Sequence, residues 1–206
     1  MKDFGLYLVT DQFDLSEDEF LNVIEQSIQG GVSIVQIREK TSTTKDFYEL
    51  AKKCKDITDK YNVPLIINDR IDVAQAVDAA GVHLGQDDMP CTVARRILGA
   101  DKTIGISASN YEEAKKAQDD GADYLGVGAI VETSTKKDAK IVTHEDLEKI
   151  KEEIEIPTVA IGGVNESNTN KIVTTYDFDG IAVVSAIMLA DDPKKASENL
   201  LNLIDS

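Results

Sequence analysis

The chain has 206 residues, and 42% of them are hydrophobic, which is enough to build one full-sized core. Its 22 basic and 38 acidic residues give a formal net charge of −16, which argues against nucleic acid or an anionic membrane surface as the partner. The sequence has no signal segment and no apolar run of membrane-spanning length, so a cytoplasmic protein is expected, with its oligomeric state left open.

Eight short runs of apolar and β-branched residues recur along the chain, and each is followed by a polar or glycine-rich tip and an amphipathic stretch. The expected strands are Leu6 to Thr10, Ile34 to Arg38, Leu65 to Asn68, Gly81 to Leu84, Thr103 to Ser107, Asp123 to Val127, Thr158 to Ile161 and Gly180 to Val184. Apolar strands that alternate with helices indicate a parallel sheet covered by helices. Eight such units favour a compact, single-domain (β/α)8 TIM barrel over residues 1–206, and an open doubly wound sheet is the alternative.

The helix signals are clearest near the two ends of the chain. Ser16 and Glu19 have the spacing of a capping box, so a helix is expected from Ser16 to Gln29. Further helices are expected from Thr44 to Tyr61 and from Pro193 to Ile204.

Two cations follow the second strand on one face. Side chains alternate along a strand, so Gln36, Arg38 and Lys40 share a face that excludes Ile37 and Glu39. A rigid guanidinium fork beside a mobile ammonium group suits a polyanion, while a solvated strand end with two surface cations is the alternative.

Acidic side chains follow the third and fourth strands. Asp69 follows the third strand and Asp87-Asp88 follows the fourth, and these tips meet at the same end of a barrel, where oxygen ligands of this kind suit Mg²⁺ when substrate phosphate is also bound. Helix-capping or surface carboxylates are the alternative. His83, inside the fourth strand, is expected to be a hydrogen-bonded residue of the barrel interior and not a metal ligand.

Two further tips carry groups suited to phosphate. The long connection after the sixth strand contains Thr133, Ser134, Thr135 and Lys136, and such loops are often lids. Gly162-Gly163 and the Ser185 turn follow the seventh and eighth strands, where barrels of this type bind phosphate; a tight turn that needs glycine without a ligand is the alternative. Together these tips predict a site that joins two phosphorylated substrates by expelling diphosphate.

These motifs resemble the thiamine-phosphate synthase family almost from end to end. The stretches that carry the resemblance are Leu6 to Asp11, Gln36 to Lys40, Ile67 to Arg70, Gly81 to Asp88, Thr133 to Asp138, Ala160 to Gly163 and Asp179 to Ile187. The resemblance implies a transferase of thiamine biosynthesis that couples hydroxymethylpyrimidine diphosphate to hydroxyethylthiazole phosphate. It also implies that diphosphate leaves first and that the thiazole nitrogen captures the resulting pyrimidine-stabilised carbocation.

The resemblance assigns roles residue by residue. The pyrimidine diphosphate would contact the stretch Gln36, Ile37, Arg38, Glu39 and Lys40 together with Asn68, Ser107 and Lys136. Arg38, Lys40, Ser107 and Lys136 would act in catalysis, and Asp69 and Asp88 would hold Mg²⁺. The thiazole phosphate would contact Thr133, Ser134, Thr135, Gly163, Val184 and Ser185.

The chain departs from the family in two places. Ala129, Val131 and Glu132 stand where the family carries proline and an aromatic residue, and Ser109 replaces a histidine. A thiazole tautomerase on the same barrel and a non-catalytic sensor of phosphate ligands are the competing functions. The joint presence of Arg38, Lys40, Asp69, Asp88 and Lys136 favours the transferase.

Overall fold

Eight parallel strands close into a barrel in the computed structural model, which describes residues 4–132 and 140–204. The strands are β1 (Leu6–Val9), β2 (Ile34–Ile37), β3 (Leu65–Asn68), β4 (Gly81–Leu84), β5 (Thr103–Ala108), β6 (Tyr124–Val127), β7 (Thr158–Ile161) and β8 (Gly180–Val183). They follow one another around the barrel in chain order, and β8 pairs with β1 through the partners Leu6 and Ile181. The predicted (β/α)8 barrel is therefore confirmed, and the open sheet is excluded.

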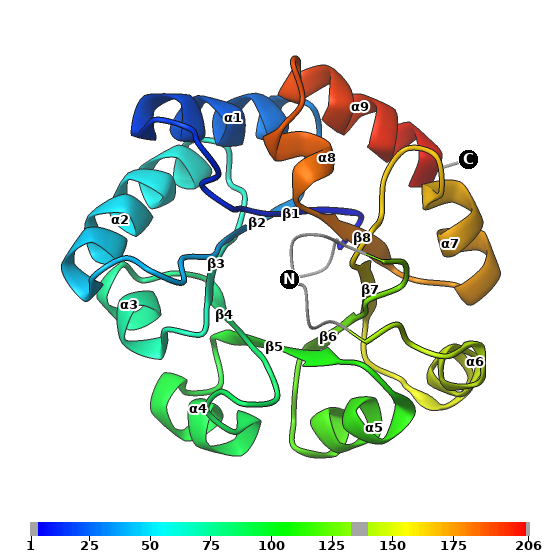
Figure 1. Cartoon of the computed structure of the whole chain (residues 1–206). Helices are drawn as coiled ribbons and strands as arrows, with labels where there is room; N and C mark the ends of the chain where they lie inside the picture. The colour runs from blue at the N-terminus through cyan, green and yellow to red at the C-terminus, as the bar shows by residue number, and fades with distance from the viewer. Residues whose placement is uncertain (1–3, 133–139, 205–206) are drawn as a thin grey trace.

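Helices form a ring outside the strands (Figure 1). They are α1 (Glu17–Gln29), α2 (Thr44–Lys60), α3 (Ile71–Ala76), α4 (Cys91–Leu98), α5 (Tyr111–Asp119), α6 (His144–Glu153), α7 (Thr169–Tyr176), the short α8 (Ser185–Met188) and α9 (Pro193–Ile204). The predicted capping box is present, because Ser16 N–H donates to the Glu19 carboxylate at 2.8 Å and Ser16 Oγ accepts from Glu19 N–H. No helix in residues 4–132 or 140–204 is both long enough and apolar enough to cross a bilayer.

Side-chain alternation divides the apolar residues into two clusters. The larger cluster fills the space between strands and helices and includes Leu6, Leu8 and Ile37. The smaller one fills the barrel and includes Tyr7 and Tyr124. Because every strand is covered on both sides, its polar groups can reach solvent only near the strand ends, and the carboxyl ends of all eight strands meet at one mouth.

Candidate functional site

A cavity of about 680 Å³ opens at the carboxyl ends of the strands, and each of the eight strands contributes to its lining. Ten of the predicted site residues line this one cavity: Gln36, Arg38, Lys40, Asn68, Asp69, Asp88, Ser107, Gly163, Val184 and Ser185. The barrel thus brings together positions that are up to 149 residues apart in the sequence, from 36 to 185.

Of the other predicted residues, two do not line the cavity and four cannot be placed against it. Thr133, Ser134, Thr135 and Lys136 lie outside the described residues. Ile37 is fully buried between the barrel and the helices, and Glu39 accepts a hydrogen bond from Ser42 Oγ at 2.7 Å. The side chains of Ile37 and Glu39 lie away from the cavity because their neighbours Gln36, Arg38 and Lys40 face it.

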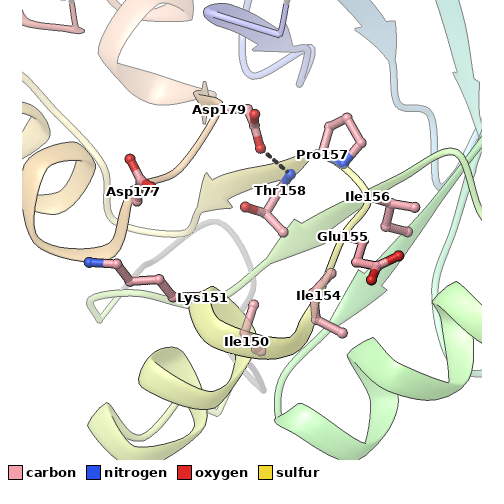
Figure 2. A pocket seen from close by; sticks show the side chains of 9 residues that line it. All are labelled: Ile150, Lys151, Ile154, Glu155, Ile156, Pro157, Thr158, Asp177 and Asp179. Atoms are coloured by element: carbon pink, nitrogen blue, oxygen red, sulfur yellow. Dashed lines mark hydrogen bonds between the residues drawn. The ribbon is translucent and has the colours of Figure 1, made fainter.

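A smaller cavity of about 220 Å³ lies at the opposite end of the barrel, where β7 and β8 begin (Figure 2). Two of its polar side chains bind neighbouring main chain. Asp179 accepts from Thr158 N–H at 2.8 Å, and Lys151 donates to the Thr175 carbonyl at 3.1 Å. It contains none of the predicted site residues, so the chemistry is expected at the other end.

The basic part of the mouth is held by carboxylates. Arg38 Nη1 donates to Asp11 Oδ2 at 2.9 Å, and Arg38 N–H donates to Thr10 Oγ1 at 3.2 Å. Lys40 forms an ion pair with Asp69. Asp11 ends the first strand motif and received no role from the sequence, yet it fixes one edge of the guanidinium and leaves the other donors of Arg38 for an anion.

Two carboxylates meet beside Lys40. Asp69 has a positive φ of 62°, a backbone conformation that is uncommon for any residue but glycine. Burial raises the pKa of Asp69, the hydrogen bond from Lys40 opposes that shift, and the adjacent Asp88 carboxylate adds to it. Asp88 Oδ2 also accepts from Gly85 N–H at 2.7 Å. Two partly buried carboxylates in contact repel each other, and a divalent cation relieves that repulsion, so this donor set fits Mg²⁺ with further oxygens from water or phosphate.

The floor of the cavity carries neutral polar groups. Asn68 is only 7% exposed and lines the cavity, and its amide has no hydrogen-bond partner among residues 4–132 and 140–204. Since no buried side-chain nitrogen or oxygen of the described residues lacks a partner, the Asn68 amide opens into the cavity, where a ligand can pair with it. Gln36 and Ser107 flank the same floor, and His83 binds Ser107 Oγ through Nε2 at 2.9 Å, as expected for an interior histidine.

The side of the mouth at β7 and β8 is built around two glycines. Gly162 and Gly163 have φ values of 90° and 73°, and the main chain after β6 pairs with them, since Val131 N–H donates to the Gly162 carbonyl at 3.0 Å. A Cβ at Gly163 would lie 2.8 Å from the Glu132 carbonyl oxygen. The glycines are therefore needed for the turn and for close packing, and the Gly163 N–H stays without an acceptor among the described residues, as an anion site requires.

Gly163→Ala is expected to destabilise the fold by about 2–4 kcal/mol, because the change adds a clash with the Glu132 carbonyl to the strain of a positive φ. Denaturant unfolding measures this. Gly121→Ala is the matched control, since Gly121 has a φ of 86° and nothing within 4 Å of an added Cβ. Equal losses in the two variants would contradict the packing role of Gly163.

The departures from the family pattern border the cavity. Ser109 N–H and Oγ both donate to Glu113, at 2.7 and 2.9 Å, and both residues line the cavity. Ala129 is buried, while Glu132 lines the cavity and Val131 is 40% exposed. The serine at this tip is thus tied to a carboxylate on the wall.

Comparison with known proteins gives the same family that the sequence motifs resemble. The family model described as thiamine monophosphate synthase matches residues 6–187. Thiamine-phosphate synthase of Methanobrevibacter smithii is 56% identical over 97% of this chain and 94% of its own length, and that of Clostridium tetani is 54% identical over 96% and 94%. The solved thiamine phosphate pyrophosphorylase of Pyrococcus furiosus is 39% identical and superposes with a TM-score of 0.90, covering 99% of this chain and 96% of that one.

Proposed function

The chain belongs to the thiamine monophosphate synthase family, and on this basis we propose that it joins hydroxymethylpyrimidine diphosphate to hydroxyethylthiazole phosphate with Mg²⁺ bound. It is a transferase that acts on pyrimidine and thiazole phosphates to form thiamine phosphate. The tautomerase and sensor alternatives have no support from its relatives. We propose in addition that the metal is Mg²⁺ and that the protein acts in the cytoplasm.

One observation carries this proposal: the carboxylates of Asp69 and Asp88 meet beside Lys40 on the wall of the cavity that Arg38 also lines. A diphosphate is stabilised by cations. Two carboxylates beside the cationic side chains supply a binding place for a metal cation as well. Mg²⁺ bound there would neutralise charge on the leaving diphosphate. Asp69 and Asp88 would hold it, and Lys40 would exchange its partner Asp69 for a phosphate oxygen.

The pyrimidine ring is assigned to the neutral floor. Asn68 offers an unpaired amide there, and Gln36 and Ser107 add one polar group on either side. A heterocycle with donors and acceptors on its edge satisfies such groups better than water held in a narrow cavity does. The diphosphate then lies toward Arg38 and Lys40, which are farther along β2 and its tip.

The thiazole phosphate is assigned to Gly163, Val184 and Ser185. All three line the cavity beside the short α8, and the N–H groups of such turns bind anions without adding positive charge. This separation matches the two anions by charge: the diphosphate takes the cationic side and the monophosphate the neutral side.

The reaction proposed for this site needs little acid or base. The C–O bond between the pyrimidine methylene and the diphosphate breaks with its electron pair going to oxygen, and the thiazole nitrogen then donates its pair to the methylene carbon. Arg38, Lys40 and Lys136 would stabilise the leaving anion, and the apolar and neutral floor would exclude water from the cation.

The test is to incubate the purified protein with both substrates, with each substrate omitted in turn, and with EDTA in place of Mg²⁺. Thiamine phosphate is expected only when both substrates and Mg²⁺ are present. Equal product formation in EDTA would refute the metal, and no product in any mixture would refute the proposed function.

Arg38→Lys is expected to lower kcat/KM by about 10-fold, although the charge is conserved. An ammonium group cannot keep the Asp11 contact at 2.9 Å and also present a second edge to the diphosphate. Steady-state kinetics measures the effect. Arg96→Lys, at an exposed position on α4, is the matched control, and equal activity of the two variants would count against an anchoring fork.

A further inference from the structure

Five side chains form a continuous series of hydrogen bonds across the barrel interior, on the floor of the mouth cavity. Gln36 Nε2 donates to Tyr7 Oη at 2.7 Å, and Tyr7 Oη lies 2.8 Å from Tyr124 Oη. Tyr124 Oη lies 2.9 Å from His83 Nδ1, and His83 Nε2 lies 2.9 Å from Ser107 Oγ. The two ends are residues that the proposed function assigns to the pyrimidine, and the three in the middle have no role in it.

The barrel makes room for this chain at two glycines. A Cβ at Gly105 would lie 2.1 Å from the Tyr124 ring, and one at Gly126 would lie 3.0 Å from the His83 ring. Tyr7 and Tyr124 are 1% and 0% exposed. Bulky aromatic rings with polar tips are thus held in fixed positions where aliphatic residues usually fill a barrel.

One donor direction satisfies the hydrogen bonds of these five side chains. Burial raises the pKa of both phenols, so each carries one proton and can donate only once. With Tyr7 accepting from Gln36, all of these contacts are satisfied when the Tyr7 proton goes to Tyr124 and the Tyr124 proton goes to His83 Nδ1. An imidazole that accepts at Nδ1 carries its proton on Nε2 and donates to Ser107 Oγ.

The ends of the chain therefore face the cavity with opposite polarity. Ser107 Oγ accepts from His83, which leaves the hydroxyl proton of Ser107 for a ligand. Gln36 uses Nε2 inside the barrel, and its Oε1 has no partner among the described residues. An aminopyrimidine offers the complement, because its exocyclic amino group donates and its ring nitrogens accept. A 4-oxopyrimidine has a carbonyl in place of that amino group and a ring N–H, so it presents the reverse pattern.

We propose that this one-way chain fixes an acceptor at Gln36 and a donor at Ser107, which makes Tyr7, Tyr124 and His83 positioning residues that select an aminopyrimidine over an oxopyrimidine. The selectivity rests on the proposed function, whereas the donor direction is a property of the free protein. A site built around such a pattern rejects the mismatched ring because its own polar groups would stay unpaired.

The direction is tested first, without substrate, by the imidazole ¹⁵N spectrum of the labelled protein. The chain has two histidines, and the surface variant His144→Gln assigns their signals. The neutral Nε2–H tautomer is expected for His83, and Tyr124→Phe is expected to add the Nδ1–H form. A wild-type Nδ1–H tautomer or imidazolium, or a tautomer unmoved by Tyr124→Phe, would overturn the proposal.

Selectivity is tested by comparing kcat/KM for the aminopyrimidine diphosphate and its 4-oxo analogue. Tyr124→Phe is expected to lower the ratio by about 10-fold or more. Tyr7→Phe serves as the second variant if Tyr124→Phe does not fold. Tyr61→Phe, which also loses a hydrogen-bonded hydroxyl but lies far from the cavity lining, should keep the wild-type ratio. We call the hydrogen-bonded side chains from Gln36 to Ser107 the relay. If Tyr124→Phe makes thiamine phosphate with an unchanged ratio, the role of the relay in selectivity is refuted and the proposed function stands. If the wild type makes no thiamine phosphate, the proposed function is refuted, and the imidazole ¹⁵N spectrum still tests the donor direction of the relay.

Discussion

Asp69→Asn is expected to lower turnover by about 10³-fold, the largest effect of any single change considered for this chain. The amide keeps the size of the side chain but removes one of the two carboxylates that would hold Mg²⁺, and with it the charge that attracts the ion. The leaving diphosphate would then lose much of its neutralisation in the transition state, which is where such charge matters most.

The same change is expected to leave folding stability equal or slightly higher in the absence of metal. Burial raises the pKa of Asp69 above its ordinary value, so folding disfavours its ionised form at neutral pH. Stability from this group is therefore gained as the pH falls, and removal of the charge removes the penalty. Loss of activity without loss of thermal stability would separate a functional acid from a structural one.

Turnover at saturating Mg²⁺ and thermal melting in EDTA measure the two effects. Asp72→Asn is the matched control, since Asp72 lies three residues away, pairs with Arg70 and does not line the cavity. An Asp69→Asn enzyme with wild-type turnover would rule out Asp69 as a metal ligand.

Lys136→Ala is expected to lower turnover by on the order of 10²-fold, the cost of losing one donor to a developing anion. The family resemblance assigns Lys136, and not its neighbour Lys137, to the diphosphate. Lys137→Ala is therefore the sharpest control, because it removes the same charge one position away. Equal kinetic losses in both variants would show that net charge matters and that the residue-by-residue assignment is wrong.

Thermal stability should hardly change in the Lys136→Ala variant, since substitution of a residue assigned only to a ligand removes no fold contact. A matching drop in melting temperature and in turnover would argue for a structural role. The two lysine variants should therefore be melted under the same conditions as they are assayed.

The barrel could be predicted because its signals are local. Each strand is a short β-branched run ended by a polar tip, and β3, β4 and β7 begin and end at the predicted residues. Thr10, Arg38 and Val184 were expected inside strands but lie just beyond them, where the chain turns into the mouth. Such ends depend on which neighbour supplies the last ladder bond, and that information is not local.

The site was predictable wherever a charged or amide side chain stood at a strand tip, as at Arg38, Asn68 and Asp69. The ion pair between Arg38 and Asp11 was not predicted, because a contact between two strand tips depends on which strands are neighbours in the barrel. The relay was not predicted for a similar reason. Tyr7 and Tyr124 are 117 residues apart, and a tyrosine within an apolar run is normally assigned to the hydrophobic core. Gly105 and Gly126 were the available signal, since glycine inside a strand often marks the close approach of another group.

The coupling of the two products is tested by measuring diphosphate and thiamine phosphate together in one reaction, for the wild type and for Asp69→Asn. The proposed transfer predicts one diphosphate for each thiamine phosphate at every time point, with both products falling together in the variant. Diphosphate release that exceeds thiamine phosphate while both substrates are saturating would contradict it, because the mouth would then cleave one substrate without joining it to the other.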